Sequence, residues 1–203
     1  MKLFEVYPLY NVTPVRGEGV FIIDDKNKKY LDFYGGHAVI SIGHSHPSFI
    51  NKLNEQIKKI IFYSNAIINP LQNQLAKKIQ KHFLLKNYKL FLCNSGAEAI
   101  ENALKLCSFH SNKKRVIAFK NSFHGRTSAA LAVTDNDHIK SPLNKQQKVT
   151  FLKLNDSKGL EKELKKGDVC AIIIECIQGA GGLDQVSEKF MNELKILSEK
   201  HKT

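Results

Sequence analysis

The stretch CNSGAEAIENALKLC, which runs from Cys93 to Cys107, decides the fold and raises the first question about function. The apolar run at 88–92 before it predicts a buried strand, and the apolar residues after Ser95 recur at helical spacing. A strand, a tight turn and a helix start together present unpaired backbone N–H groups and a positive dipole end, where a phosphate can bind. An ordinary strand-to-helix connection, with Ser95 as N-cap and Gly96 relieving the turn, explains the same residues equally well.

Outward from this stretch, strands and helices alternate to the end of the chain. The predicted strands are 88–92, 115–119, 149–154 and 169–175, and the predicted helices are 96–108, 157–166 and 188–200, with a short helix after residue 127. Before them, a hairpin is expected at Gly19–Phe33 with its tip at Asp25–Asn27, followed by helices that begin near Pro47 and Pro70. This alternation indicates an α/β fold with a mostly parallel sheet, and ligands are expected at the carboxyl ends of its strands.

Three polar loops that contain glycine fall at those strand ends, at 94–97, 121–127 and 176–182. In the loop SFHGRT, Phe123 offers a face for a planar ring and Arg126 offers a fork for a carboxylate. The alternative reading places the Phe123 ring in the core and pairs Arg126 with a surface carboxylate.

The apolar run IIIECIQGAGG ends in a carboxylate, Glu175, which is unusual in a buried strand unless a polar partner waits there. Gln178 has the chemistry to hydrogen-bond a ligand or only the loop backbone. The motif GHSHP brings His44 and His46 close in sequence, but no carboxylate or cysteine lies at ligand spacing, so loop packing is favoured and no metal site is expected.

The bulk composition is that of a folded globular protein: 203 residues, 42% hydrophobic and 25% charged. A net charge of +12 suggests nucleic acid, but the lysines are spread over polar helix faces without a long basic run, so nucleic-acid binding is not expected. Four cysteines without a CxxC pair fit reduced thiols. Neither a signal peptide nor an apolar run of membrane-spanning length is found, so we expect a cytoplasmic protein with no membrane partner.

As a set, the segments RGEGVFIID, KYLDFYGGHAVISIGHSHP, CNSGAEAIENALK, SFHGRT and IIECIQGAGG resemble the class III aminotransferases, which depend on pyridoxal phosphate. The resemblance spans essentially the whole chain and is closest to the acetylornithine aminotransferases of arginine biosynthesis, followed by the ornithine aminotransferases. It implies aminotransferase fold type I, with residues 1–45 as an N-terminal segment belonging to the small domain. Residues 46–203 would then be an incomplete large, cofactor-binding domain.

The resemblance also implies roles for particular residues. Pyridoxal 5′-phosphate would be bound by Ser95, Gly96, Ala97, Phe123, Glu175 and Gln178, with the SGA turn on its phosphate and the Phe123 ring stacked on its pyridine. Arg126 would take a substrate carboxylate, and His37 stands where ornithine enzymes have a tyrosine, which favours an N-acylated ornithine. The implied reaction moves the δ-amino group of an N-acyl-ornithine to 2-oxoglutarate in a homodimer.

Two departures from the family pattern are small and one is large. Cys176 and Ala180 stand where relatives commonly have proline and a second glutamate. The aspartate that pairs with the pyridine nitrogen and the lysine that binds the cofactor covalently match no residue here, so no catalytic residue is assigned and a truncated form is expected. A non-catalytic chain that binds a phosphate-bearing ligand or a partner, and an ornithine aminotransferase-type enzyme, remain the alternatives.

Overall fold

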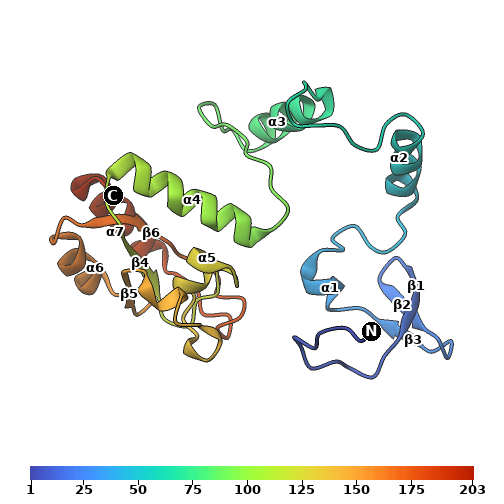
Figure 1. The fold of residues 1–203 in the computed structure, drawn as a ribbon, viewed down its shortest axis with the longest axis horizontal. Helices are drawn as coiled ribbons and strands as arrows, with labels where there is room; N and C mark the ends of the chain where they lie inside the picture. Colours follow the sequence, from blue (N-terminus) through green and yellow to red (C-terminus); the bar gives the residue numbers. More distant parts are fainter. The chain divides into compact units, whose positions relative to one another are not determined.

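The computed structural model describes all 203 residues, and contacts within the chain divide it into two units, Met1–Tyr88 and Lys89–Thr203. Figure 1 follows the chain from the first unit, blue to green, into the second, green to red. This division does not coincide with the boundary expected after residue 45, and that domain assignment stays a prediction.

The first unit contains an antiparallel sheet of three strands in the order β1 (Pro14–Glu18), β2 (Phe21–Asp24) and β3 (Lys29–Leu31). At the turn between β2 and β3, Asp24 Oδ1 accepts hydrogen bonds from the N–H groups of Lys26 and Lys28, at 2.9 and 2.8 Å. The predicted hairpin tip is therefore confirmed, and β1 is a further strand that the sequence did not predict.

Three helices complete the first unit: α1 (Gly35–Ala38), α2 (Pro47–Ile57) and α3 (Pro70–His82). Proline begins both α2 and α3, where its missing N–H costs no hydrogen bond. The apolar side chains that helical spacing gathers on α2 and α3, such as Leu53 and Leu71, remain exposed. Across the whole chain, no helix combines the length and the apolar character needed to cross a membrane.

The second unit has a parallel sheet in the order β5-β4-β6, formed by β4 (Arg115–Phe119), β5 (Val149–Leu152) and β6 (Val169–Ile172). The helices around it are α4 (Gly96–Ser111), α5 (Ser128–Ala132), α6 (Ser157–Leu164) and α7 (Glu188–His201), and two short 3₁₀ turns, η1 (Asp137–Ile139) and η2 (Asn144–Gln146), lie between α5 and β5. The predicted parallel α/β fold is confirmed.

The central strand β4 is buried along its whole length, and its side chains alternate between two cores. Val116 and Ala118 pack with Leu104 of α4 on one face. Ile117 and Phe119 pack on the other face with residues of α6 and α7, Leu160 and Phe190 among them. The sheet is therefore covered by helices on both sides, as expected for parallel strands.

An arginine ties the amino-terminal edge of this sheet to α6. The Arg115 guanidinium donates to Glu163 Oε2 at 2.7 Å, to Asp168 Oδ1 at 2.6 Å and to Thr150 Oγ1 at 2.8 Å. The hydrogen bonds from Arg115 lower the pKa of the Asp168 carboxyl. The pKa of the Glu163 carboxyl is lowered mainly by its hydrogen bond from Lys166 and to a smaller extent by the one from Arg115.

The strand expected at 88–92 is not formed, which corrects the prediction. A strand is held by ladder hydrogen bonds to a neighbour, and this segment pairs with no strand within residues 1–203. Its apolar side chains, including Phe91, are exposed. Strands β5 and β6 also end earlier than predicted, at Leu152 and Ile172. The last residue of β5 pairs with Phe119, where β4 ends, whereas the last residue of β6 pairs with Ile117.

Candidate functional site

The turn before α4 fits both readings of the sequence, an anion-binding turn and an ordinary capped helix start. Ser95 is the N-cap, with extended backbone, and its Oγ accepts the N–H of Glu98 at 3.1 Å. The Glu98 carboxylate in turn accepts the N–H of Asn94 at 2.5 Å. No hydrogen bond within the chain uses the N–H groups of Gly96 and Ala97, as is usual in the first turn of a helix, so two donors are available at its positive end.

The loop after β4 lies directly against this turn. Gly125 has φ 141°, and a Cβ added there would lie 2.9 Å from the Cβ atoms of both Ala97 and Ala130. Only a glycine allows so close an approach with that backbone conformation. Loops 94–97 and 121–127, which the sequence places at predicted strand ends, therefore meet in the structure.

The third loop, after β6, joins the same region. Glu175 Oε2 accepts the N–H of Phe123 at 2.9 Å, across a sequence separation of 52 residues. A side chain at Gly181 would collide with the carbonyl oxygen of Asn121, so the two loops touch there as well. All three loops are thus brought to the carboxyl ends of the strands.

The burial and hydrogen bonds of the individual side chains agree with some of the expected alternatives and not with others. The Phe123 side chain is 41% exposed, so it is not part of the core, and Arg126 is exposed. Gln178 is only 1% exposed, and its Nε2 donates to the Lys120 carbonyl at 2.7 Å, so its amide hydrogen-bonds loop backbone, as one alternative expected. Its assignment to the cofactor, like the roles of the other site residues, stays a prediction.

Residues of the first unit behave as loop and turn elements. His37 has φ 62°, and its Nε2 lies 2.6 Å from the hydroxyl of Tyr34. His44 Nε2 lies 2.7 Å from Asp32 Oδ2, and this hydrogen bond is the main cause of the lowered pKa of Asp32. His44 is therefore hydrogen-bonded within a loop, as the sequence favours. The substrate role of His37 stays a prediction.

The sequence reading missed the interior of the SFHGRT loop. His124 is 9% exposed, and its Nε2 is buried without a hydrogen-bond partner. Burial lowers the pKa of His124, and the negative charge of Glu175 partly opposes that shift. The hydroxyl oxygen of Thr134 accepts the N–H of His124 at 2.9 Å and lies 3.2 Å from the Gly125 carbonyl. No local motif marks Thr134, because its partners lie nine and ten residues earlier.

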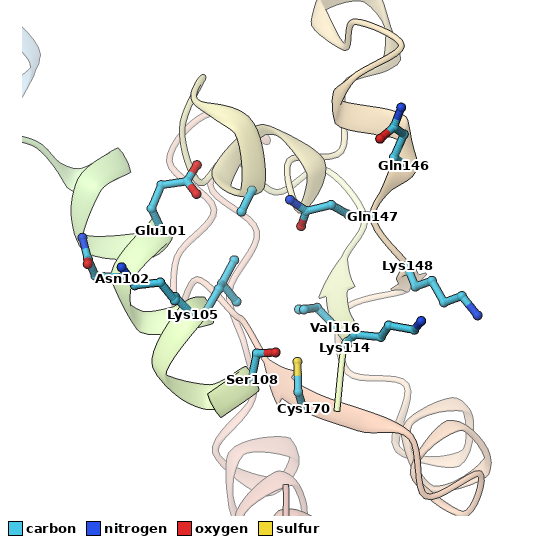
Figure 2. A pocket seen from close by; sticks show the side chains of 12 residues that line it. Glu101, Asn102, Lys105, Ser108, Lys114, Val116, Gln146, Gln147, Lys148 and Cys170 are labelled. Atoms are coloured by element: carbon cyan, nitrogen blue, oxygen red, sulfur yellow. The ribbon is translucent and has the colours of Figure 1, made fainter. Parts of the chain in front are cut away.

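The cavity drawn in Figure 2 lies away from these loops. It has a volume of about 550 Å³ and lies beside α4 near the amino ends of the strands, since Lys114 directly precedes β4 and Cys170 is the second residue of β6. In this view the side chains of Lys114 and Lys148 extend in the same direction, away from α4. A second cavity, of about 490 Å³, lies at the carboxyl ends of β4 and β5 and is lined by Lys120, Lys153 and Gln178.

Comparisons with known proteins agree with this arrangement. The family described as Aminotransferase class-III matches residues 5–203. The acetylornithine aminotransferase of Aquifex aeolicus (strain VF5) is 39% identical over 205 residues, which cover 98% of this chain and 54% of that protein. The chain spans about half the length of most of the curated relatives it matches.

Two solved structures extend the likeness to the fold. The ornithine aminotransferase from Toxoplasma gondii ME49 has a TM-score of 0.89 at 25% identity, covering 99% of this chain and 49% of that one. The N-acetylornithine aminotransferase from Stenotrophomonas maltophilia K279a has a TM-score of 0.79 at 29% identity, covering 97% and 50%.

Proposed function

Because the chain belongs to the class-III aminotransferases, we propose that it carries the cofactor-binding part of a pyridoxal-phosphate-dependent transaminase. The observation that carries this proposal is the meeting of three loops at the carboxyl ends of a parallel sheet. There, Gly125 touches the turn at Ala97, and Glu175 holds the backbone of Phe123. Ligands of open α/β sheets bind at such strand ends.

The residues present fit a phosphate-bearing cofactor. The N–H groups of Gly96 and Ala97 have no protein acceptor, and nothing lies within 4 Å of the place where a Gly96 side chain would stand. The space beside Gly96 is therefore open to an oxyanion that approaches the backbone. The buried Nε2 of His124 is a further polar atom that lacks a partner within the chain.

Pyridoxal phosphate, when bound, would withdraw electrons from the substrate carbon that bears the amino group. The chain's own residues would bind and orient the reactants: the Ser95–Ala97 turn the phosphate, Phe123 the ring face, and the planar fork of Arg126 a substrate carboxylate. Glu175 fixes the loop that carries Phe123. We place no lysine of residues 1–203 at the reacting carbon, so the covalent and proton-transfer steps are not assigned to these residues.

For the substrates, we propose an amino acid and a 2-oxoacid, specifically N-acetylornithine or a related N-acyl-ornithine as donor and 2-oxoglutarate as acceptor. The name and 39% identity of the Aquifex relative support this choice, as does His37 in place of a tyrosine. The corresponding setting is arginine biosynthesis by a cytoplasmic homodimer. The TM-score of 0.89 with an ornithine aminotransferase keeps ornithine as the second candidate donor.

The test separates cofactor binding from turnover. Purified residues 1–203 should bind pyridoxal phosphate reversibly in equilibrium dialysis, and Gly96→Ala should weaken that binding, because its methyl group fills the space beside the free N–H groups. Glutamate formation from N-acetylornithine and 2-oxoglutarate is expected to be absent for this chain alone. Failure of the wild-type chain to bind the cofactor would refute the proposal.

The same assay tests the assignment of steps and of substrate. Glutamate formation by residues 1–203 that Arg126→Ala abolishes would show that the reacting groups lie within this chain. In the enzyme of full family length, a preference for ornithine over N-acetylornithine would select the second candidate.

A further inference from the structure

Glu101 joins α4 to the segment that follows β4. Its Oε1 accepts the hydroxyl of Thr127 at 2.7 Å and the backbone N–H of Ala130 at 3.0 Å. Thr127 is the N-cap residue of α5 but does not cap that helix with its own side chain. One carboxylate oxygen from α4 therefore satisfies a free N–H in the first turn of α5 and holds the last residue of the SFHGRT loop.

The internal shape of that loop has a different origin. Thr134, at the far end of the same segment, binds the backbone of His124 and Gly125 and lies 2.9 Å from the Ala130 carbonyl. These bonds define the loop but do not locate it on α4. The contact of Gly125 with Ala97 brings the loop against α4, and the two bonds of Glu101 fix it there.

We propose that Glu101 is a positioning residue that sets the distance between the phosphate-binding turn at 95–97 and the ring-binding Phe123. This inference rests on the proposed function for its ligand. Glu101 lies in the second turn of α4, beyond the free N–H groups of Gly96 and Ala97, and bonds only to the segment that carries the ring site. It acts on the cofactor through that segment and not by contact.

The hydrogen bonds from Thr127 and Ala130 predict which substitution of Glu101 keeps the loop in place. Both donate to the same oxygen, Oε1, so a neutral amide oxygen at that place accepts both hydrogen bonds. Glu101→Gln should therefore behave like the wild type, whereas Glu101→Ala removes the acceptor. Glu199→Ala, which deletes an exposed carboxylate on α7, is the matched control.

The decisive experiment measures two dissociation constants for residues 1–203, one for inorganic phosphate and one for pyridoxal phosphate. Glu101→Ala should raise the constant for pyridoxal phosphate roughly tenfold, the equivalent of one or two lost hydrogen bonds. Its constant for inorganic phosphate should stay within about twofold of the wild-type value, because the turn itself is intact. An equal loss for both ligands would mean a general structural role and would overturn the proposal.

Hydrogen exchange of peptides covering 121–134 gives a readout that needs no ligand. Glu101→Ala should lose amide protection there while Glu101→Gln and Glu199→Ala keep it. If Glu101→Ala exchanges like the wild type, Glu101 does not position the loop. If the wild type binds neither ligand but the exchange result holds, the proposed cofactor fails while the loop-positioning role stands.

Discussion

Replacing Arg115 with methionine tests the ion pairs at the amino-terminal edge of the second unit's sheet. Its side chain is 9% exposed, and removing one partner of a fully buried ion pair costs about 3 to 5 kcal/mol. Here Glu163 keeps a second partner, Lys166 Nζ at 2.7 Å, and Asp168 is 54% exposed, so water can replace part of what is lost. We therefore expect Arg115→Met to lower the free energy of unfolding by about 2 to 3 kcal/mol near neutral pH.

The effect of this substitution should depend on pH with a definite sign. The folded-state pKa values of Asp168 and Glu163 are both lowered, in part by Arg115. Their stabilisation is then present above the unfolded-state carboxyl pKa values, about 4, and is lost as the pH falls through the folded values. The difference between wild type and variant should be largest near neutral pH and shrink below about pH 4.

Urea unfolding followed by circular dichroism measures both quantities. The control is Lys165→Met, which breaks the exposed pair, 3.1 Å apart, between Glu161 on α6 and Lys165, the C-cap residue of that helix, and should cost less than about 1 kcal/mol. Our reasoning is refuted if Arg115→Met costs no more than this control, or if its cost is the same at neutral and acid pH.

Three further outcomes can be checked on the same protein. Gly125→Ala should destabilise it by about 1 to 3 kcal/mol, because the residue has φ 141° and a crowded Cβ position, whereas Gly96→Ala, facing open space, should leave the melting temperature unchanged or higher. His124→Gln should reduce the loss of melting temperature as the pH falls below about 6.5, since a buried imidazole with a lowered pKa takes up its proton more readily in the unfolded state. Thr134→Val should lower the free energy of unfolding by about 1 to 3 kcal/mol, because it leaves the buried N–H of His124 without an acceptor. Thr134→Ser keeps the hydroxyl and should lose much less stability; equal losses for both variants would point to packing instead.

The parts of the fold that the sequence predicted correctly carry their own local signals. The start of α4 is marked by Ser95 as N-cap, whose Oγ accepts the N–H of Glu98, while the Glu98 carboxylate accepts the N–H of Asn94. Strand β4 is a short apolar run bounded by polar residues, and it forms over the predicted residues 115–119. The signals for both elements lie within short runs of neighbouring residues, so they can be identified without knowing their partners in the fold.

The failures involve partners that are distant in sequence. Tyr88–Leu92 has the composition of a strand, but composition does not supply the neighbour that a ladder requires. Glu101 binds residues 26 and 29 positions later. A signal for Glu101 was present, since helical spacing places a charged side chain on the same stripe of α4 as Ala97 and the buried Leu104.

The bond between Phe123 and Glu175 also has a consequence for the order in which the protein folds. It closes a segment of 52 residues, whereas the cap between Ser95 and Glu98 closes only three. Loop closure costs entropy that grows with length, and contacts distant in sequence form late. The anion-binding turn is therefore expected to exist as soon as α4 forms, while the place for a planar ring exists only after β6 has joined β4. A phosphate group can then bind as soon as α4 is formed, and a ring-bearing ligand only once the sheet is assembled.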